Sequence, residues 1–216
     1  RFGTSLNNLD LNACKKKKIK VRKLPKNINS FSVARHALGF LLNITNNFTK
    51  FKNKITISNW ERTINMSPEN TNLGIIGMGV IGKIFANYAF KLGFKINYFS
   101  RQKKNSLYRF KYFNSIDKLL QKSDVISLHL PLNVKTNNII NKDKQLLLKD
   151  KFLINTARGK LIDEKYLYYL LKKNYIKGVA LDVFEHEPPK SYSLKLRKLQ
   201  NVISTSHNSS YDEYTL

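Results

Sequence analysis

The sequence predicts an α/β fold built on a doubly wound parallel sheet. From Leu73 onward, short apolar segments alternate with amphipathic ones, which is the pattern of parallel strands joined by helical crossovers. A G-x-G-x-x-G spacing directly follows the first apolar segment. A chain of 216 residues with 42% hydrophobic residues can bury a real core, and it falls between one domain and two.

The predicted elements follow one another closely along the chain. Each predicted strand is a short apolar run, and each predicted helix carries apolar residues at helical spacing. Strands are expected at residues 73–76, 95–99, 125–131, 152–155, 178–183 and from 201 onward. Helices are expected at residues 83–92, 115–121, 142–148 and 163–172.

The part of the chain before the first of these strands predicts one long helix at residues 30–48. Its apolar positions near helical spacing include Phe31, Ala34, Leu38 and Leu41. Residues 51–72 show little periodicity and predict a connecting loop. Residues 1–29 predict one short helix and a strand at 19–24, which is too little for a domain.

The charge of the chain is strongly positive. It has 39 Lys and Arg residues against 14 Asp and Glu, a formal net charge of +25. The lysines are spread along the chain, with one compact run at residues 15–18 and no basic repeat interleaved with aromatic residues. We interpret the excess as a solvated surface, with a nucleic-acid face as the weaker alternative.

Cysteine content and hydropathy also limit the class of protein. Cys14 is the only cysteine, so neither an intrachain disulfide nor a cysteine-rich metal site is expected, and a reducing cytoplasm fits. No apolar run reaches transmembrane length. The chain opens on Arg1 and on "RFGTSLNNLDL", from which we expect a fragment of a longer protein.

The glycine-rich segment predicts a Rossmann-type dinucleotide site. Gly77, Gly79 and Gly82 lie between a strand and a helix. In this context the first glycine permits a tight turn, the second lets the backbone approach a pyrophosphate, and the third lets the helix pack on the strand. The N-terminus of the helix offers free N–H groups to the phosphates.

Three late strands are followed by polar groups that could converge at one edge of the sheet. These groups are Arg158, Glu187 and His207. Each alone is explained by an ordinary surface or loop position. Together they supply a fork for a carboxylate, an acid, and a group that titrates near neutrality, which is what reduction of a 2-keto acid requires.

The sequence resembles the D-isomer-specific 2-hydroxyacid dehydrogenases, which include phosphoglycerate dehydrogenases and glyoxylate/hydroxypyruvate reductases. The matching stretches run in the family's order over nearly the whole chain. They are "RFGTSLNNLDL", "SVARHALGFLL", "LGIIGMGVIGK", "SDVISLHLPL", "INTARGKLIDE", "GVALDVFEHEPP" and "NVISTSHN". The resemblance implies an NAD(P)-dependent oxidoreductase that moves a hydride between nicotinamide and a small D-2-hydroxy or 2-keto acid.

The resemblance also implies roles for individual residues. Arg158 would bind the substrate carboxylate, and Glu187 would pair with His207, the acid/base. Asp182 would hold the nicotinamide carboxamide. Val80 and Ile81 would lie against the pyrophosphate, and the further candidates for cofactor contacts are Pro131, Thr136, Thr156 and Ala157. The helix beginning at Ser30 would form a homodimer.

The chain departs from the family pattern at several positions. Ser206 replaces the usual Pro before the histidine, and Ser5 replaces a glycine whose backbone lies near the substrate carboxylate. Asn208, Ser209 and Ser210 stand where small apolar residues or glycine are usual. Arg35 stands where an acid is common, and we interpret the adjacent His36 as a helix-face residue without a catalytic role.

The resemblance implies three parts of the chain. Residues 1–29 would be a remnant of the substrate-binding domain, residues 30–210 the NAD(P)-binding domain, and residues 211–216 the start of a truncated return segment.

The end of the second strand predicts which cofactor is used. NAD enzymes place an acid here for the ribose hydroxyls, and that acid would repel the extra phosphate of NADP. This chain has Ser100 and Arg101, with Lys103 and Lys104 close behind. We therefore expect NADP in preference to NAD, while the two lysines could belong to the general lysine excess.

Two further classes of function remain open. The first is a catalytically inactive nucleotide-binding fragment, or an interaction module like the related C-terminal-binding corepressors. The second is nucleic-acid binding through the excess of positive charge.

Overall fold

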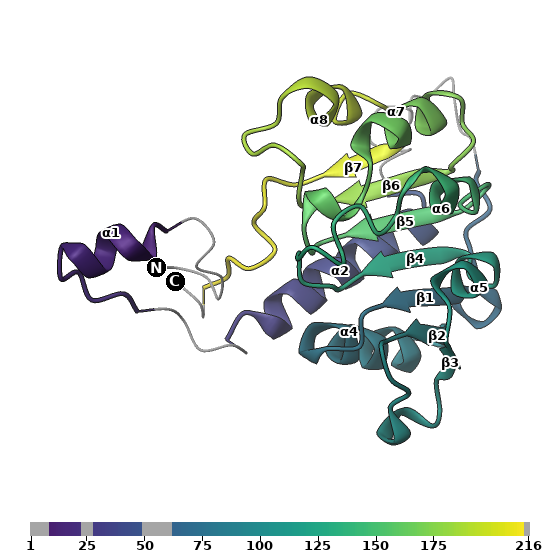
Figure 1. The fold of residues 1–216 in the computed structure, drawn as a ribbon. Coiled ribbons are helices and arrows are strands. Elements are labelled where there is room, and N and C mark those ends of the chain that lie inside the picture. The colour runs from purple at the N-terminus through teal and green to yellow at the C-terminus, as the bar shows by residue number, and fades with distance from the viewer. Residues whose placement is uncertain (1–8, 23–27, 49–61, 214–216) are drawn as a thin grey trace.

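The fold is a seven-stranded parallel sheet covered by helices on both faces (Figure 1). The computed structural model describes residues 9–22, 28–48 and 62–213. The strand order within them is β3-β2-β1-β4-β5-β6-β7. The strands are β1 (Asn72–Ile76), β2 (Lys95–Phe99), β3 (Lys111–Phe113), β4 (Val125–Leu128), β5 (Phe152–Asn155), β6 (Gly178–Leu181) and β7 (Val202–Ser204).

The order of the strands reverses at β1, which pairs with β2 on one side and with β4 on the other. Such a switch point leaves an opening between the two diverging crossovers at the carboxyl ends of the strands. The central strands are apolar along their length because helices cover both of their faces. All residues of β4 and β6 are accordingly buried.

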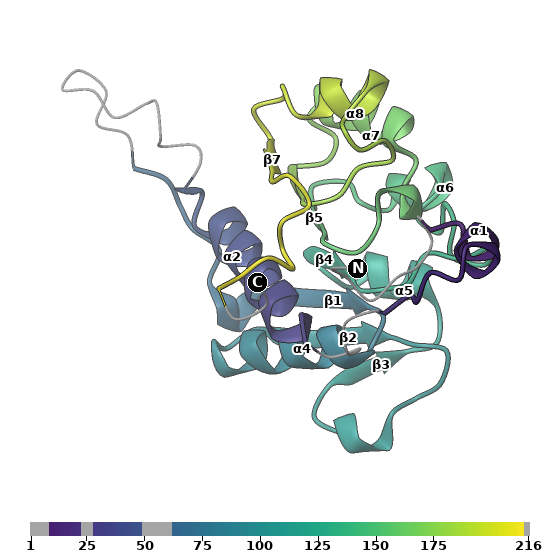
Figure 2. The same cartoon turned by 90° about the vertical axis from the view of Figure 1, so that its left-hand side faces the viewer.

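The helices form two layers, which Figure 2 shows edge-on. One layer packs α2 against α4, with α2 also contacting β5 and β6. The other layer contains α5, α6 and α7, and α8 contacts α7. The helices are α1 (Leu11–Lys16), α2 (Ser30–Thr45), α4 (Val80–Lys91), α5 (Ile116–Gln121), α6 (Lys142–Leu146), α7 (Glu164–Lys172) and α8 (Ser191–Leu196).

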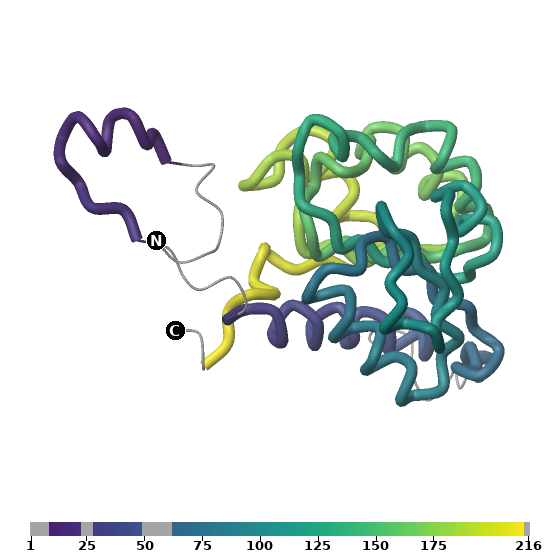
Figure 3. Tube along the Cα trace, turned by 60° about the horizontal axis from the view of Figure 1, so that its bottom comes forward, coloured from purple at the N-terminus to yellow at the C-terminus, as the bar shows by residue number. Residues whose placement is uncertain are grey.

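Each layer has its own hydrophobic core. On the α2 and α4 side, Leu41 and Phe85 are fully buried against the sheet. On the opposite side, Leu119 and Leu167 are fully buried. Helix α1 has no buried residue, and Figure 3 shows it apart from the sheet. Within the described residues, no helix has the length and apolar character needed to cross a bilayer.

The predicted doubly wound parallel sheet is confirmed, and six of its strands were predicted from the sequence. Strand β3 and helix α8 were not predicted. The strand predicted at residues 19–24 is wrong over its described part, residues 19–22, which are irregular. The remainder of that strand and residues 51–61 of the loop predicted at 51–72 lie outside the described residues.

Helix α2 differs from its prediction in two ways. It ends at Thr45, three residues earlier than expected, in a turn at Asn46. Phe31 is 59% exposed, so it does not belong to the buried face, whereas Ala34 and Leu41 are buried as predicted. Helix α4 begins at Val80, earlier than expected, because the helix starts immediately after the glycine-rich turn.

Candidate active site

The residues that directly follow the parallel strands all lie at one edge of the sheet. They are Gly77 after β1, Ser100 after β2, His129 after β4, Thr156 after β5, Asp182 after β6 and Thr205 after β7. Parallel strands place their carboxyl ends at the same edge, where open α/β sheets bind ligands. The predicted site residues therefore come from one region.

The glycine-rich turn is shaped by two glycines whose environment excludes a side chain. Gly77 has φ +105°, and a Cβ there would lie 2.5 Å from the His129 carbonyl oxygen. A Cβ on Gly82 would lie 2.1 Å from the Gly77 carbonyl oxygen, which keeps α4 close to β1. At Gly79, by contrast, no described atom other than those of its chain neighbours lies within 4 Å of that position, so this glycine faces open space.

The N-terminus of α4 is open for an anion. Gly79 is the N-cap residue, and no described side chain caps the helix. The N–H groups of Val80 and Ile81 lie in the first turn, where no carbonyl of the same helix can accept them. The Val80 side chain is 48% exposed. This end of α4 can therefore bind phosphate, as the glycine spacing predicts.

His129 lies beside this turn and was not predicted as a site residue. Its Nε2 is 2.9 Å from Ser127 Oγ, and its ring lies 5.1 Å from the Phe85 ring. Burial lowers the pKa of His129 to about 3, so the ring is neutral. The only sign in the sequence was its position directly after a predicted strand, because a partly buried neutral histidine carries no sequence pattern of its own.

The end of β2 carries the two residues on which the cofactor prediction depends. Ser100 is buried, and its hydroxyl donates to the Gln102 carbonyl oxygen at 2.5 Å, which shapes the turn. Arg101 is exposed in that turn. The turn lies next to the glycine loop, because Gly77 N–H donates to the Phe99 carbonyl oxygen at 3.0 Å.

The loop after β4 contains two further predicted cofactor residues. Thr136 Oγ1 donates to the Pro131 carbonyl oxygen at 2.6 Å and accepts from Asn133 N–H at 2.9 Å. Pro131 is exposed and Thr136 partly so. The hydroxyl of Thr136 therefore makes its hydrogen bonds within its own loop and stabilises the turn of that loop.

The loop after β5 presents Thr156, Ala157 and Arg158. Asn155 holds it from below, since its side chain accepts from Ala157 N–H at 3.0 Å and donates to the Arg158 carbonyl oxygen at 2.9 Å. Arg158 Nη1 donates to the Ala157 carbonyl oxygen at 2.6 Å. Thr156 Oγ1 is buried without a hydrogen-bond partner among the described residues.

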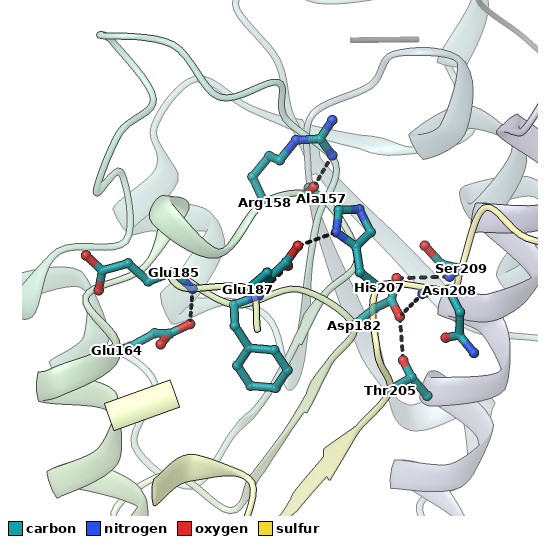
Figure 4. A network of polar contacts seen from close by, with 11 residues as sticks. Ala157, Arg158, Glu164, Asp182, Glu185, Glu187, Thr205, His207, Asn208 and Ser209 are labelled. Carbon is teal, nitrogen blue, oxygen red and sulfur yellow. Dashed lines mark hydrogen bonds and ion pairs between the residues drawn. The ribbon is translucent and has the colours of Figure 1, made fainter. Parts of the chain in front are cut away.

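Glu187 and His207 form the predicted pair. His207 Nδ1 lies 2.6 Å from Glu187 Oε2, and Glu187 Oε1 accepts from Phe184 N–H at 3.0 Å (Figure 4). An ionised carboxylate can only accept, so Nδ1 is the donor and Nε2 is the ring nitrogen left to exchange a proton.

The two members of this pair shift each other's pKa. The hydrogen bond to Glu187 raises the pKa of His207 above 6.5, against partial burial and the nearby charge of Arg158. For Glu187, partial burial favours the neutral form, but the bonds from His207 and Phe184 N–H outweigh it, and its pKa is lowered below 4.5. Both shifts therefore favour the charged form of the pair.

Asp182 lies behind the pair and is fully buried. Its Oδ1 accepts from Thr205 Oγ1 at 2.5 Å and from Asn208 N–H at 3.0 Å, and its Oδ2 accepts from Ser209 N–H at 3.0 Å. Burial favours the neutral acid, but these bonds outweigh it and lower its pKa. In this structure Asp182 is engaged with the loop that carries His207, and its contact with a nicotinamide stays a prediction.

Helix α2 is connected to the same loop (Figure 3). Ser32 Oγ donates to the Ser209 carbonyl oxygen at 2.8 Å, and Arg35 pairs with Asp212 at 2.5 Å. His36 Nε2 lies 3.0 Å from Thr205 Oγ1. Because Thr205 gives its only hydroxyl proton to Asp182, His36 is the donor. His36 thus supports the loop from the helix face.

These features fit a bound dinucleotide. The uncapped start of α4 and the open space at Gly79 suit a pyrophosphate, and the unpaired hydroxyl of Thr156 offers a polar contact further along the edge. The sheet order and the glycine turn define a Rossmann-type NAD-binding domain. At its edge stands an imidazole paired with a carboxylate, beside an arginine.

Comparison with known proteins gives the same class. The family described as D-isomer specific 2-hydroxyacid dehydrogenase, NAD binding domain, matches residues 38–209. The chain therefore belongs to the D-isomer specific 2-hydroxyacid dehydrogenase family. Its enzymes are oxidoreductases, as the resemblance implied.

Similar proteins include a D-3-phosphoglycerate dehydrogenase of Methanocaldococcus jannaschii, 35% identical over 99% of this chain and 41% of the relative. A hydroxypyruvate reductase of Thermotoga maritima is 36% identical over 96% of this chain and 68% of the relative. The chain thus spans about 41% to 68% of the length of these two relatives.

Solved structures share the fold. A D-lactate dehydrogenase with NAD+ from Lactobacillus jensenii has a TM-score of 0.87 at 26% identity, covering 99% of this chain and 69% of that one. An acyclic imino acid reductase in complex with NADPH and D-Arg has a TM-score of 0.82 at 28% identity, covering 100% and 70%. The neighbours thus include proteins with NAD and with NADPH, so the NAD(P) class is supported without a preference.

The His207–Glu187 pair predicts a defined pH dependence of stability. The raised pKa of His207 makes its contribution complete below pH 6.5 and lost as pH rises through the raised value. The lowered pKa of Glu187 makes its contribution complete above pH 4.5 and lost as pH falls through the lowered value. Both contributions are complete only between these two limits.

We therefore expect a double-mutant cycle with Glu187→Gln and His207→Gln to give its largest coupling at about pH 5.5 and a smaller one at about pH 9. Both side chains are more than a third exposed, so solvent screening keeps the coupling to about 1 kcal/mol or less. Urea unfolding at each pH measures it. A coupling that grows with pH would contradict the assigned charge states.

The substitution Asp182→Asn tests the support of the His207 loop. Its amide NH₂ would face an N–H donor of Asn208 or Ser209, and a buried donor without an acceptor costs about 1–3 kcal/mol. We expect the free energy of unfolding to fall by about that amount in chemical denaturation. The control is Asp124→Asn. Asp124 accepts both hydrogen bonds from Asn72 at Oδ2, and the amide oxygen of asparagine can take the place of that oxygen. An equal loss of stability in Asp124→Asn would contradict the prediction.

Proposed function

We propose that the protein is an NADP-preferring 2-keto-acid reductase that acts on a glyoxylate- or hydroxypyruvate-like substrate and forms the D-2-hydroxy acid. The observation that carries the proposal is the 2.6 Å contact of His207 Nδ1 with Glu187 Oε2 at the sheet edge that also presents Arg158. The glyoxylate and hydroxypyruvate reductases among its relatives support the substrate class.

Each of the three side chains has a task in this reaction. A bound nicotinamide supplies the hydride to the keto carbon. Arg158 binds the substrate carboxylate with its planar fork and never loses its charge. His207 gives the proton on Nε2 to the oxygen that becomes the hydroxyl, and Glu187 keeps the imidazole protonated and oriented.

The reaction is tested by turnover of glyoxylate and hydroxypyruvate in the whole protein with NADPH. In His207→Gln we expect kcat to fall by about 10²- to 10⁴-fold, because the proton donor is lost. The matched control is His186→Gln, since His186 is an exposed histidine of the loop that carries Glu187. Its kcat should stay near that of the parent.

Equal activity of parent and His207→Gln would overturn the assignment of the acid. A parent that binds the cofactor but reduces no keto acid would favour the second candidate, a nucleotide-binding module without catalysis. The retained Glu187–His207 pair argues against that candidate, because a non-catalytic module has no need of a charged pair that is more than a third exposed.

NADPH is expected to bind more tightly than NADH. Arg101 is exposed beside the glycine loop, and no acid follows β2 directly. Loss of one charge-assisted hydrogen bond in Arg101→Ala should weaken NADPH binding roughly tenfold and leave NADH binding unchanged. Titration of nicotinamide fluorescence measures both.

Lys103→Ala is the control for general positive charge, since Lys103 is also exposed in this turn. If it weakens NADPH binding as much as Arg101→Ala does, the cluster acts only through its net charge. Tighter binding of NADH by the parent would refute the preference altogether.

The domain assignment is proposed with the function. Residues 30–210 would bind the cofactor, residues 1–29 would belong to a substrate-binding domain, and residues 211–216 would start the return to it. The match of the NAD binding domain to residues 38–209 supports the first of these. A homodimer through α2 is part of the same proposal, and the exposed Phe31 on that helix supports it.

A further inference from the structure

A buried glutamate outside the Arg158, Glu187 and His207 set lies under the site. Glu164 is the first residue of α7, and it is 3% exposed. Its Oε1 accepts from Glu185 N–H at 2.7 Å (Figure 4). Its Oε2 accepts from Ser193 Oγ at 2.5 Å. A carboxyl group this buried is costly unless its oxygens are used, so its position is specified by these two bonds.

The N–H group that Glu164 holds belongs to the peptide between Phe184 and Glu185. The N–H of Phe184 in turn donates to Glu187 Oε1 at 3.0 Å, which orients the carboxylate that binds His207. The hydrogen bond from Glu185 N–H to Glu164 therefore also affects the position of the Glu187 carboxylate, because only a short turn separates the two.

The same peptide also supports the loop of Arg158. A Cβ on Gly159 would lie 1.9 Å from the Phe184 carbonyl carbon and 2.3 Å from Glu185 N. The backbone next to Arg158 thus rests directly on the peptide that Glu164 holds. A shift of that peptide would move both the carboxylate of the pair and the arginine.

We propose that Glu164 is a positioning residue, which fixes the Phe184–Glu185 peptide and through it sets the relative placement of Glu187 and Arg158. The role rests on the proposed reductase function. Glu164 acts on the reacting groups only through this peptide. Ser193, on α8, donates to Oε2 of Glu164, so α8 also contacts the carboxyl group that holds this peptide.

The test compares two substitutions at one position. Glu164→Ala removes the acceptor of Glu185 N–H. Glu164→Gln keeps an oxygen for that N–H and offers an NH₂ group to Ser193 Oγ, so it should restore the arrangement. The control for lost stability is Leu167→Ala, one turn along α7, which is fully buried but has no bond to the peptide.

The first readout is the pKa of His207, measured by NMR titration of the imidazole resonances. The chain has four histidines, and a His207→Gln spectrum assigns the signal. We expect the raised pKa to return toward 6.5 in Glu164→Ala and to stay raised in Glu164→Gln and Leu167→Ala. The second readout is kcat, expected to fall roughly ten- to hundredfold in Glu164→Ala alone.

Two results would overturn the proposal. One is a His207 titration in Glu164→Ala that matches the parent, and the other is an equal change in Leu167→Ala. The titration needs no turnover, so it decides the role of Glu164 even if the parent reduces no keto acid, which would refute only the reductase function.

Discussion

Three successive backbone N–H groups converge on Asp182, and the geometry of the site depends on them. His207 N–H donates to the Asp182 carbonyl oxygen at 2.8 Å, and the next two residues donate to its carboxylate. Consecutive N–H groups around a residue in the left-handed region make a concave site for an anion, and His207 has φ +55°. A left-handed conformation is uncommon outside glycine and costs free energy. Here the buried carboxylate offsets that cost, and it fixes the imidazole relative to the end of β6.

This arrangement explains how the loop tolerates its unusual sequence. A proline at Ser206 would restrict the backbone before His207 through its ring, and small residues after His207 would ease a left-handed turn. The chain has Ser206 and Asn208 instead. Tertiary bonds replace what local stiffness would provide, since Asp182 binds the loop from below and α2 binds it from the side through Ser32 and His36. Helix α2 and the segment after β7 are therefore joined around the loop that carries His207.

The sequence was sufficient for the features that depend on local pattern. The glycine spacing and the apolar runs predicted where β1, β2 and β5 lie, because each requires only neighbouring residues to form its turn or strand. Strand β3 escaped prediction because its three residues, Lys111–Phe113, have no buried apolar run and are stabilised by pairing with β2. The strand predicted at 19–24 was wrong over its described residues 19–22 for the converse reason, since an apolar pattern alone does not form a strand without a partner strand.

The site residues also divide into those that the local sequence could predict and those that it could not. Arg158, Glu187 and His207 could be predicted because each follows a predicted strand and has a chemistry of its own. Glu164 and His129 could not, because a buried carboxylate and a neutral imidazole are recognised only by what they touch. Asp182 was predicted as a site residue, but its bonds to Asn208 and Ser209 depend on how the loop after β7 folds back, which no local spacing encodes.

The large positive charge of the chain can attract anions to this site, but it cannot orient them. With 39 cationic residues against 14 acidic ones, the field of the chain favours encounter with anionic ligands such as the proposed cofactor and keto acid. Charge that is spread over the whole surface does not orient a ligand. The proposed hydride transfer requires the keto acid to be placed within a fraction of an ångström. Orientation must come from fixed donors. The acids Asp182, Glu187 and Glu164 are each committed to an N–H group or an imidazole, so the anion contacts of the proposed reaction are assigned to Arg158 and the start of α4.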